Sequence, residues 1–215
     1  PNARDYLESL RDTPIAKQLA ARSLPFEWTE VSLVSDHPDK TLNMDASADL
    51  LLLPRMLETI GRPSEQLDLV SPYFVPMKQG TEDLAALAGR IKVRVLTNSL
   101  ESTDVCAVHA GYAKRRKALL RSGVQLFELK RTETATSAQR KSSSGSSSAS
   151  LHAKTLAVDR RRIFVGSFNF DPRSARLNTE LGLVFDSPTL AQSLGDAFDR
   201  EVPLRAYEVR LSEDG

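Results

Sequence analysis

His152-Ala153-Lys154 opens the stretch of this chain that is most informative about its fold and its chemistry. Asp159 follows, and Gly166-Ser167-Phe168-Asn169-Phe170-Asp171 completes the pattern H-x-K-x4-D-x6-G-S-x-N-x-D. In an extended strand, residues two apart point to the same face, so His152 and Lys154 share one direction. Ser167 and Asn169 have the same spacing. The pattern therefore predicts one site that combines an imidazole, a cation and two hydrogen-bond donors.

These residue types together suit attack on a phosphodiester. A neutral imidazole can attack phosphorus and form a phospho-histidine, which divides one difficult displacement into two easier ones. Lys154 would bring positive charge to the phosphoryl oxygens, and Ser167 and Asn169 would donate hydrogen bonds to them. Further along, Glu180 can accept a hydrogen bond from the second ring nitrogen of His152 and so fix its tautomer. Asp159 is expected at a turn, away from the pocket.

The pattern resembles the catalytic motif of the phospholipase D superfamily, and the match continues through Asn178-Thr179-Glu180. The resemblance implies a layered α/β fold and the same roles for the catalytic residues His152, Lys154 and Glu180 and for the phosphate-binding residues Lys154, Ser167 and Asn169. The structural positions of the motif are Asp159, Gly166 and Asp171. No zinc or calcium ligand cluster stands out in the sequence, and Lys154 can serve the role of a metal, so we expect neither a metal nor another cofactor.

Flanking stretches look like the C-terminal half of bacterial cardiolipin synthases of the C type. They are Ser71–Pro76, Thr97–Leu100 with Thr103-Asp104, Val108–Tyr112 and Asp171–Asn178. Within them, Tyr73 and His109 are candidate residues of a substrate pocket. The resemblance implies synthesis of cardiolipin from two phospholipids at a membrane surface. We expect a peripheral protein of the bacterial inner membrane, on a side that the sequence leaves open.

The reaction of this superfamily requires two such motifs, and this chain holds one H-x-K. We expect a missing N-terminal half that carries the first motif, and the absence of an initial Met fits that expectation. Two alternatives stay open: a single-motif phosphodiesterase or nuclease that forms a homodimer, and a half-domain that is inactive when isolated. The composition disfavours nucleic acid as a partner, since aromatic residues make up only 6% of the chain and no base-stacking platform stands out.

The order of predicted elements favours an α/β layered fold with a mixed, mostly parallel sheet flanked by helices. We expect one domain over residues 1–215, with a Ser-rich flexible loop at 137–150. The predicted helices are 5–22, 48–60, 81–89, 108–122 and 188–202, and the predicted strands are 31–34, 67–70, 91–96, 124–129, 155–158, 162–165, 181–185 and 204–211. The residues between 158 and 162 form a predicted hairpin turn.

Charge is unevenly distributed along the chain. The net charge is only +1, but residues 1–108 have 11 Lys/Arg against 16 Asp/Glu, whereas residues 109–215 have 18 against 12. The basic half carries the motif and would attract phosphate groups of lipids or nucleic acids. The single cysteine, Cys106, excludes an intrachain disulfide. No run approaches the ~18 apolar residues that span a bilayer.

Overall fold

The computed structural model of the chain describes residues 10–24, 26–42, 47–131 and 151–212. Its strands form an eight-stranded sheet in the order β1-β7-β6-β5-β2-β3-β4-β8. The strand bounds are β1 Val31–Ser35, β2 Gln66–Val70, β3 Lys92–Asn98, β4 Gln125–Leu129, β5 Thr155–Val158, β6 Arg162–Gly166, β7 Leu181–Phe185 and β8 Ala206–Val209. The layered α/β class predicted from the sequence is confirmed.

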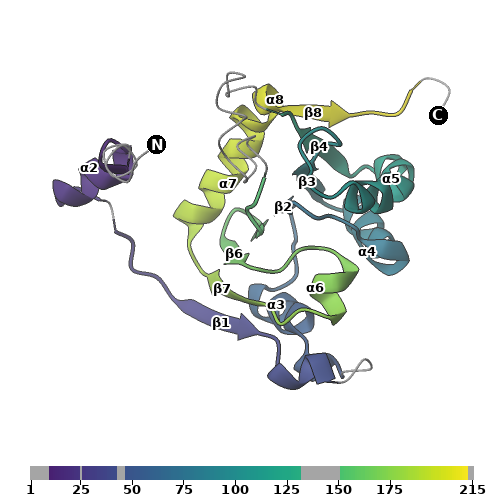
Figure 1. Cartoon of the computed structure of the whole chain (residues 1–215), viewed down its shortest axis with the longest axis horizontal. Coiled ribbons are helices and arrows are strands. Elements are labelled where there is room, and N and C mark those ends of the chain that lie inside the picture. The colour runs from purple at the N-terminus through teal and green to yellow at the C-terminus, as the bar shows by residue number, and fades with distance from the viewer. Residues whose placement is uncertain (1–9, 25, 43–46, 132–150, 213–215) are drawn as a thin grey trace, which may run out of the picture.

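Helices cover both faces of the sheet (Figure 1). The α-helices are α2 Pro14–Ala20, α3 Leu52–Ile60, α4 Met77–Ala88, α5 Cys106–Arg121, α6 Pro172–Arg176, α7 Pro188–Arg200 and α8 Val202–Arg205, and the 3-10 turns are η1 Pro38–Leu42 and η2 Ala48–Leu50. Helices α3, α4 and α5 lie on one face, whereas α7 crosses the other face over β5, β6 and β2. None of the helices in the described ranges is long and apolar enough to cross a membrane.

The mostly parallel arrangement predicted for the sheet is wrong. Only β2–β3 and β3–β4 pair in parallel. The pairs β1–β7, β7–β6, β6–β5, β5–β2 and β4–β8 are antiparallel. The prediction came from the alternation of strand and helix between β2 and β4, where crossover helices do enforce parallel strands. After β5 the chain instead reverses direction twice, through the tight β5–β6 turn and then through the segment that contains α6, so β5, β6 and β7 pair antiparallel.

The β5–β6 connection illustrates this reversal. Asp159 and Arg160 both adopt positive φ, 52° each, as in the primed turns that suit the twist of a hairpin. The Asp159 carboxylate accepts hydrogen bonds from the backbone N–H groups of Ser64, Glu65 and Gln66 at 2.8–3.1 Å. These bonds tie the turn to the start of β2 and offset the strain of the left-handed backbone.

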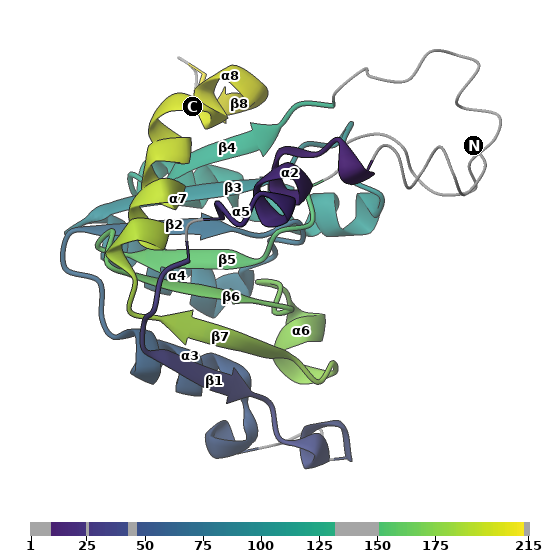
Figure 2. The same ribbon diagram turned by 90° about the vertical axis from the view of Figure 1, so that its left-hand side faces the viewer.

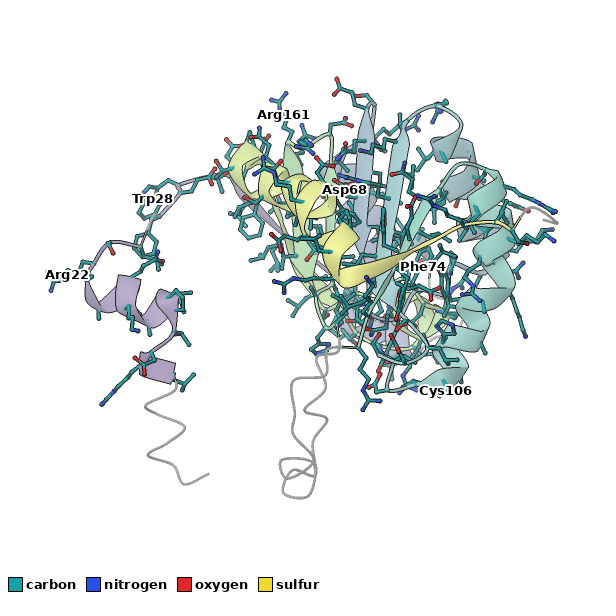
Figure 3. The ribbon with its side chains drawn as sticks, turned by 90° about the horizontal axis from the view of Figure 1, so that it is seen from above. Arg22, Trp28, Asp68, Phe74, Cys106 and Arg161 are labelled. Carbon is teal, nitrogen blue, oxygen red and sulfur yellow. The ribbon has the colours of Figure 1, made fainter. Side chains whose placement is uncertain are left out.

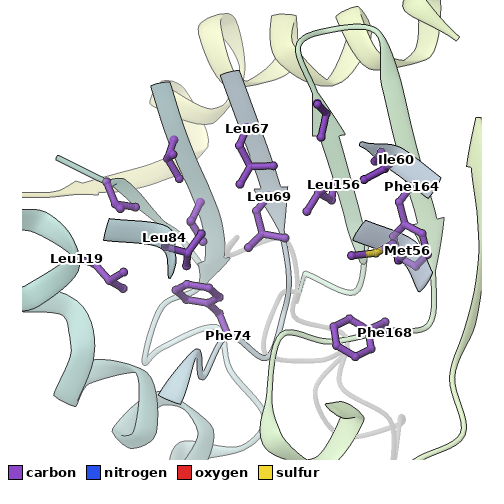
Figure 4. Close-up of a cluster of buried hydrophobic side chains, with 14 of the residues drawn as sticks. Met56, Ile60, Leu67, Leu69, Phe74, Leu84, Leu119, Leu156, Phe164 and Phe168 are labelled. Atoms are coloured by element: carbon purple, nitrogen blue, oxygen red, sulfur yellow. The ribbon is translucent and has the colours of Figure 1, made fainter. Parts of the chain in front are cut away.

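Side chains alternate between two separate cores. Leu67 and Leu69 of β2 point toward α3, α4 and α5 and pack with Leu84, as Figure 4 shows. Val70 of the same strand belongs to a second cluster with Phe198 of α7. Both faces of β2 are therefore buried, and the strand is predominantly apolar, as expected for a central strand.

Several predicted boundaries differ from the structure. The helix predicted over 48–60 is divided into η2 and α3, because Leu51 has an extended backbone and the Ser47 side chain makes no capping bond. Of the helix predicted over 5–22, the described residues contain only α2, which begins at Pro14. The strand predicted over 204–211 is shortened by α8. The Ser-rich loop at 137–150 lies outside the described residues.

Candidate active site

The motif residues meet at one end of the sheet, where β2 and β3 end and β5 begins. Register pairs Thr155 of β5 with both Val70 of β2 and Val165 of β6. Gly166 N–H donates to the Lys154 carbonyl at 3.1 Å, and Ser167 N–H donates to the Leu181 carbonyl at 2.9 Å. The segments that precede β5, follow β6 and precede β7 are therefore neighbours, and α6 lies at the same end in Figure 2.

His152 and Lys154 lie just before β5 rather than inside it. The Lys154 Nζ atom lies 2.9 Å from His152 Nδ1 and donates to the His152 carbonyl at 2.9 Å. The two side chains thus meet, as the i, i+2 spacing predicts. An ammonium can only donate, so in this arrangement Nδ1 is the acceptor and Nε2 carries the ring proton.

Lys154 is half-buried beside two carboxylates. Burial lowers its pKa below the usual lysine value, and the nearby charges of Glu180 and Asp171 oppose that shift. Partial burial favours the neutral amine of Lys154. The two carboxylates favour the protonated ammonium and so oppose this effect. The site therefore presents an ammonium group beside the His152 ring.

Glu180 is buried, and both of its carboxylate oxygens are occupied. Oε2 accepts the hydroxyl of Ser167, while Oε1 accepts the Ser174 hydroxyl at 2.7 Å and the Asn178 amide at 3.2 Å. The structure gives no hydrogen bond between Glu180 and His152, both of which are described. The predicted contact with the second ring nitrogen is therefore not made in this arrangement, and the role of Glu180 in orienting His152 stays a prediction.

Ser167 and Asn169 both lie beside this carboxylate network. The Ser167 hydroxyl donates to Glu180 and accepts from Leu181 N–H at 3.1 Å. The Asn169 backbone N–H donates to the Ser174 hydroxyl at 3.3 Å, and its buried side-chain oxygen has no hydrogen-bond partner. Because Ser167 has a single hydroxyl proton, it must release Glu180 before it can donate to a phosphate as predicted.

The remaining motif residues shape the backbone. A side chain at Gly166 would place its Cβ 2.5 Å from the Leu181 carbonyl oxygen, so only glycine fits. Asp171 caps α6 by accepting from Arg173 N–H at 2.7 Å and Ser174 N–H at 2.9 Å, and burial raises the pKa of its carboxyl group. Asp159 lies at the β5–β6 turn, at the opposite end of β5 from His152.

Tyr73 belongs to a loop that contacts the motif. Val75 N–H donates to the Phe170 carbonyl at 2.7 Å, and Phe170 N–H donates to the Ser71 hydroxyl at 3.1 Å. The Tyr73 hydroxyl donates to Asp104 at 2.9 Å, and burial, together with this bond and the charges of Asp104 and Asp171, raises the pKa of Tyr73 to about 12. Tyr73 therefore lies beside the site but makes no hydrogen bond to the motif.

His109 lies in the helical layer. It is buried in α5, its ring packs edge-on against Tyr112 at 5.6 Å between centroids, and its Nδ1 atom has no partner. It makes no hydrogen bond to a described motif residue, so its role in a substrate pocket stays a prediction.

Sequence reasoning did not single out three residues that organise the site: Ser174, Asp36 and Lys40. Ser174 lies within the stretch that carries the resemblance, but its type gave no signal. Asp36 and Lys40 are about 140 positions before Glu180, and only the folded chain brings them together. In the parts of the chain that the structure describes, no group of three or more His, Cys, Asp or Glu side chains is placed to hold a metal ion.

The chain also matches a known protein family. Residues 56–202 match the family described as Cardiolipin synthase, PLD-like domain. The chain belongs to this family. The matched range of this PLD-like domain contains the whole motif from His152 to Glu180.

Curated relatives extend the similarity. The chain is 43% identical over 212 residues to cardiolipin synthase C of Escherichia coli, and the alignment covers 98% of this chain and 45% of that protein. It is 28% identical over 184 residues to a cardiolipin synthase of Listeria welshimeri, covering 84% of this chain and 32% of that protein. The chain thus spans less than half the length of these curated relatives.

Solved structures show the same fold. Nuc of Salmonella typhimurium, a phospholipase D family member, has a TM-score of 0.58 at 18% identity, covering 85% of this chain and all of Nuc. Phosphatidylserine synthase of Haemophilus influenzae Rd KW20 has a TM-score of 0.57 at 16% identity, covering 97% of this chain and 47% of that protein. At these identities the likeness establishes the fold alone.

Proposed function

We propose that this PLD-like domain is one catalytic half of an enzyme that transfers phosphatidyl groups and makes cardiolipin from two phospholipids. The observation that carries the proposal is the meeting of His152 and Lys154 at the sheet end, next to the buried Glu180 network. Family membership and the similarity to cardiolipin synthase C support the lipid substrate class. No cofactor is needed for this chemistry.

The proposed reaction has two displacements. A histidine nitrogen attacks the phosphorus of the first phospholipid, an N–P bond forms, and the bond from phosphorus to the leaving headgroup oxygen breaks. A second histidine protonates that oxygen. It then takes the proton from a headgroup hydroxyl of the second phospholipid, whose oxygen attacks phosphorus as the N–P bond breaks. His152 supplies one of these two imidazoles, and the first motif would supply the other.

Lys154 would change partner when substrate enters. Attack through Nε2 requires the proton on Nδ1, which now accepts a bond from Lys154. Phosphoryl oxygens carry more negative charge than a ring nitrogen, so the ammonium would move to them and release the imidazole. Lys154 would then stabilise the charge that develops on those oxygens in the transition state.

An exposed apolar strip supports a partner half. We use this name for Leu33, Leu183 and Val165, which lie side by side across β1, β7 and β6, together with Val31 and Leu181. The strip lies on the sheet face that carries α7, beyond the area that the helix covers, and it leads toward Ser167. Exposed apolar patches of this kind mark protein contact sites. We infer that the missing N-terminal half covers it and brings its own motif to His152.

The N-terminal arm, residues 10–24 and 26–30, extends on the same side of the sheet (Figures 1 and 3). Its Trp28 is 97% exposed and Phe26 is 76% exposed. Both rings are large apolar surfaces that contact with another domain would remove from water. The arm and the strip thus flank one region, which the partner half would fill.

The alternative is a homodimeric single-motif phosphodiesterase, in which a second copy covers the strip. The full coverage of Nuc by this chain's fold favours keeping this candidate. Sedimentation of the purified chain and a nuclease assay distinguish the two. A chain without nuclease activity in either state of association supports the half-enzyme, and a dimer that cleaves DNA supports the alternative.

The proposed synthase activity is tested by identifying the lipid product. The complete two-motif enzyme, meaning this chain joined to its N-terminal half, is incubated with deuterated phosphatidylglycerol vesicles, and cardiolipin is identified by mass spectrometry. Appearance of doubly labelled cardiolipin supports the proposal. Hydrolysis to phosphatidic acid without cardiolipin would contradict the synthase assignment.

Activity of the complete enzyme should survive EDTA. Lys154 and the neighbouring donors provide the charge stabilisation that a divalent ion would otherwise provide. The expected result is an unchanged initial rate of cardiolipin formation in excess chelator. Loss of activity that added Mg²⁺ or Zn²⁺ restores would mean that the site has been misread.

Helix α5 supports association with an anionic membrane. Lys114, Lys117 and Arg121 are spaced i, i+3 and i+7 and form an exposed stripe opposite the buried face of the helix. None of the three has an ion-pair partner among the described residues. Each basic side chain near an anionic bilayer contributes about 1 kcal/mol of binding. We propose that this stripe binds anionic headgroups.

Reversing the stripe should weaken membrane binding of this chain. The triple variant Lys114→Glu, Lys117→Glu and Arg121→Glu is expected to sediment with phosphatidylglycerol-containing vesicles at least about tenfold more weakly. A charge-matched control with glutamate at Lys17, Arg200 and Arg210 should bind nearly as the unmodified chain does. Equal losses for both variants would assign the effect to net charge rather than to α5.

A further inference from the structure

Beneath the site lies an ion pair with almost no exposure to water. Asp36 follows β1, and Lys40 lies in η1. Their side chains are 0% and 1% exposed, and Lys40 Nζ donates to Asp36 Oδ2 at 2.7 Å. Both residues precede the range 56–202 that matches the family. A buried pair is costly to desolvate and by itself is weak support for stability, so its other bonds are informative.

Asp36 forms two hydrogen bonds with the backbone of Glu180. Its N–H donates to the Glu180 carbonyl at 2.8 Å, and its Oδ2 accepts the Glu180 N–H at 2.8 Å. Its second oxygen, Oδ1, accepts Leu52 N–H at 2.6 Å at the start of α3. One carboxylate therefore fixes the motif glutamate to β1 and to a helix of the core.

Lys40 binds Ser174, which belongs to the hydrogen-bond network around the Glu180 carboxylate. Its Nζ atom donates to the Ser174 carbonyl at 2.8 Å. The Ser174 hydroxyl in turn donates to Glu180 Oε1 and accepts the Asn169 N–H. The ammonium thus bridges Asp36, which sets the Glu180 backbone, and Ser174, which sets the Glu180 side chain.

We propose that Asp36 and Lys40 are positioning residues of the phosphoryl-transfer site. They fix the positions of Glu180 and Ser174. The Glu180 carboxylate in turn orients the Ser167 hydroxyl and supplies negative charge near Lys154. The pair touches none of the reacting atoms. Its effect on catalysis rests on the proposed function, whereas its effect on the position of Glu180 does not.

A second buried pair provides a matched control. Arg94 and Asp68 have side chains 2% and 1% exposed, and the Arg94 Nε–Asp68 Oδ1 distance is 2.6 Å. The further bonds of Arg94 run to α7, at Asp199 and Gly195, and Asp68 also accepts from the Gln66 side chain of β2; none of these bonds runs to a described motif residue. Neutralising either pair should disturb the fold comparably, but only the Asp36–Lys40 pair should disturb the site.

The test compares Asp36→Asn with Lys40→Met against Asp68→Asn with Arg94→Met in the complete enzyme. An asparagine oxygen replaces two carboxylate oxygens, so it cannot accept both Leu52 N–H and Glu180 N–H as Asp36 does. At a temperature where circular dichroism shows both variants folded, we expect kcat to fall about 100-fold for the first variant with KM little changed. The control should keep kcat near that of the unmodified enzyme. Equal kcat losses in both would overturn the proposal.

Amide hydrogen exchange gives a measurement that needs no activity. In the purified chain, the Glu180 amide should exchange faster in the Asp36→Asn, Lys40→Met variant than in the control. Unchanged protection of Glu180 in that variant would overturn the proposal, whatever the rates. If the unmodified complete enzyme makes no cardiolipin, the proposed function fails, and this exchange result alone decides whether the pair positions Glu180.

Discussion

Replacing His152 with alanine in the complete enzyme is expected to reduce cardiolipin formation by about 10⁴-fold or more, as for loss of other nucleophiles or proton-transfer groups. Either role assigned to His152, nucleophile or proton carrier, needs a ring nitrogen at this place. The substitution should leave the fold intact, because His152 is exposed, precedes β5, and contacts only Lys154 among the described hydrogen-bond partners. The measurements are the rate of product formation and the thermal midpoint by circular dichroism.

Lys154→Ala should give a comparable defect for a different reason. It removes the cation that contacts His152 among the described residues, so the developing phosphoryl charge would lose its stabilising partner. Lys92→Ala serves as the control, because Lys92 is also partly exposed but pairs with Asp199, away from the motif. A folded His152→Ala or Lys154→Ala enzyme that retains a tenth or more of the original activity would remove that residue from the mechanism.

The central part of the fold could be predicted from local pattern, whereas the direction of the outer strands could not. Between β2 and β4, each strand is followed by a helix of about the length needed for a crossover, so parallel pairing follows. Strand β1 pairs with β7, about 150 positions away, through Val31 and Phe185. Nothing in the alternation of apolar residues along β1 specifies that partner or its direction, because alternation encodes only which face is buried.

In the site, too, local pattern predicted one part of the arrangement and missed the long-range part. The spacing of His152 and Lys154 is local, and their predicted meeting is found in the structure. Glu180 was expected to face His152, but its oxygens accept from Ser167, Ser174 and Asn178 instead. The three donors come from the segment after β6, from α6 and from the turn after α6, and Asp36 and Lys40 from the distant β1 region bind the Glu180 backbone and the Ser174 carbonyl. A sequence pattern records residue types and gaps, and cannot record such long-range bonds.

The chain of residues 1–215 alone is expected to have no measurable synthase activity. One motif supplies one imidazole, but the two displacements require a nucleophile and a separate group that protonates the leaving oxygen. The apolar strip would also stay in water, and we expect the isolated chain to self-associate through it. Mixing with the separately purified N-terminal half should restore cardiolipin formation. Activity is measured against protein concentration, alongside sedimentation velocity.

A variant with charges in the apolar strip tests whether the strip binds the partner half. Leu33→Asp with Leu183→Asp places two charges at directly paired positions of β1 and β7, where a partner surface would have to desolvate them. This variant should remain monomeric and fail to gain activity from the N-terminal half. Leu204→Asp, at an exposed apolar position outside the strip, should assemble as the unmodified chain does. Robust turnover by a monomer of the unmodified chain would refute the half-enzyme proposal. Turnover by a homodimer, lost in Leu33→Asp with Leu183→Asp, would favour the phosphodiesterase alternative, because a second copy would then supply the missing histidine across the same strip.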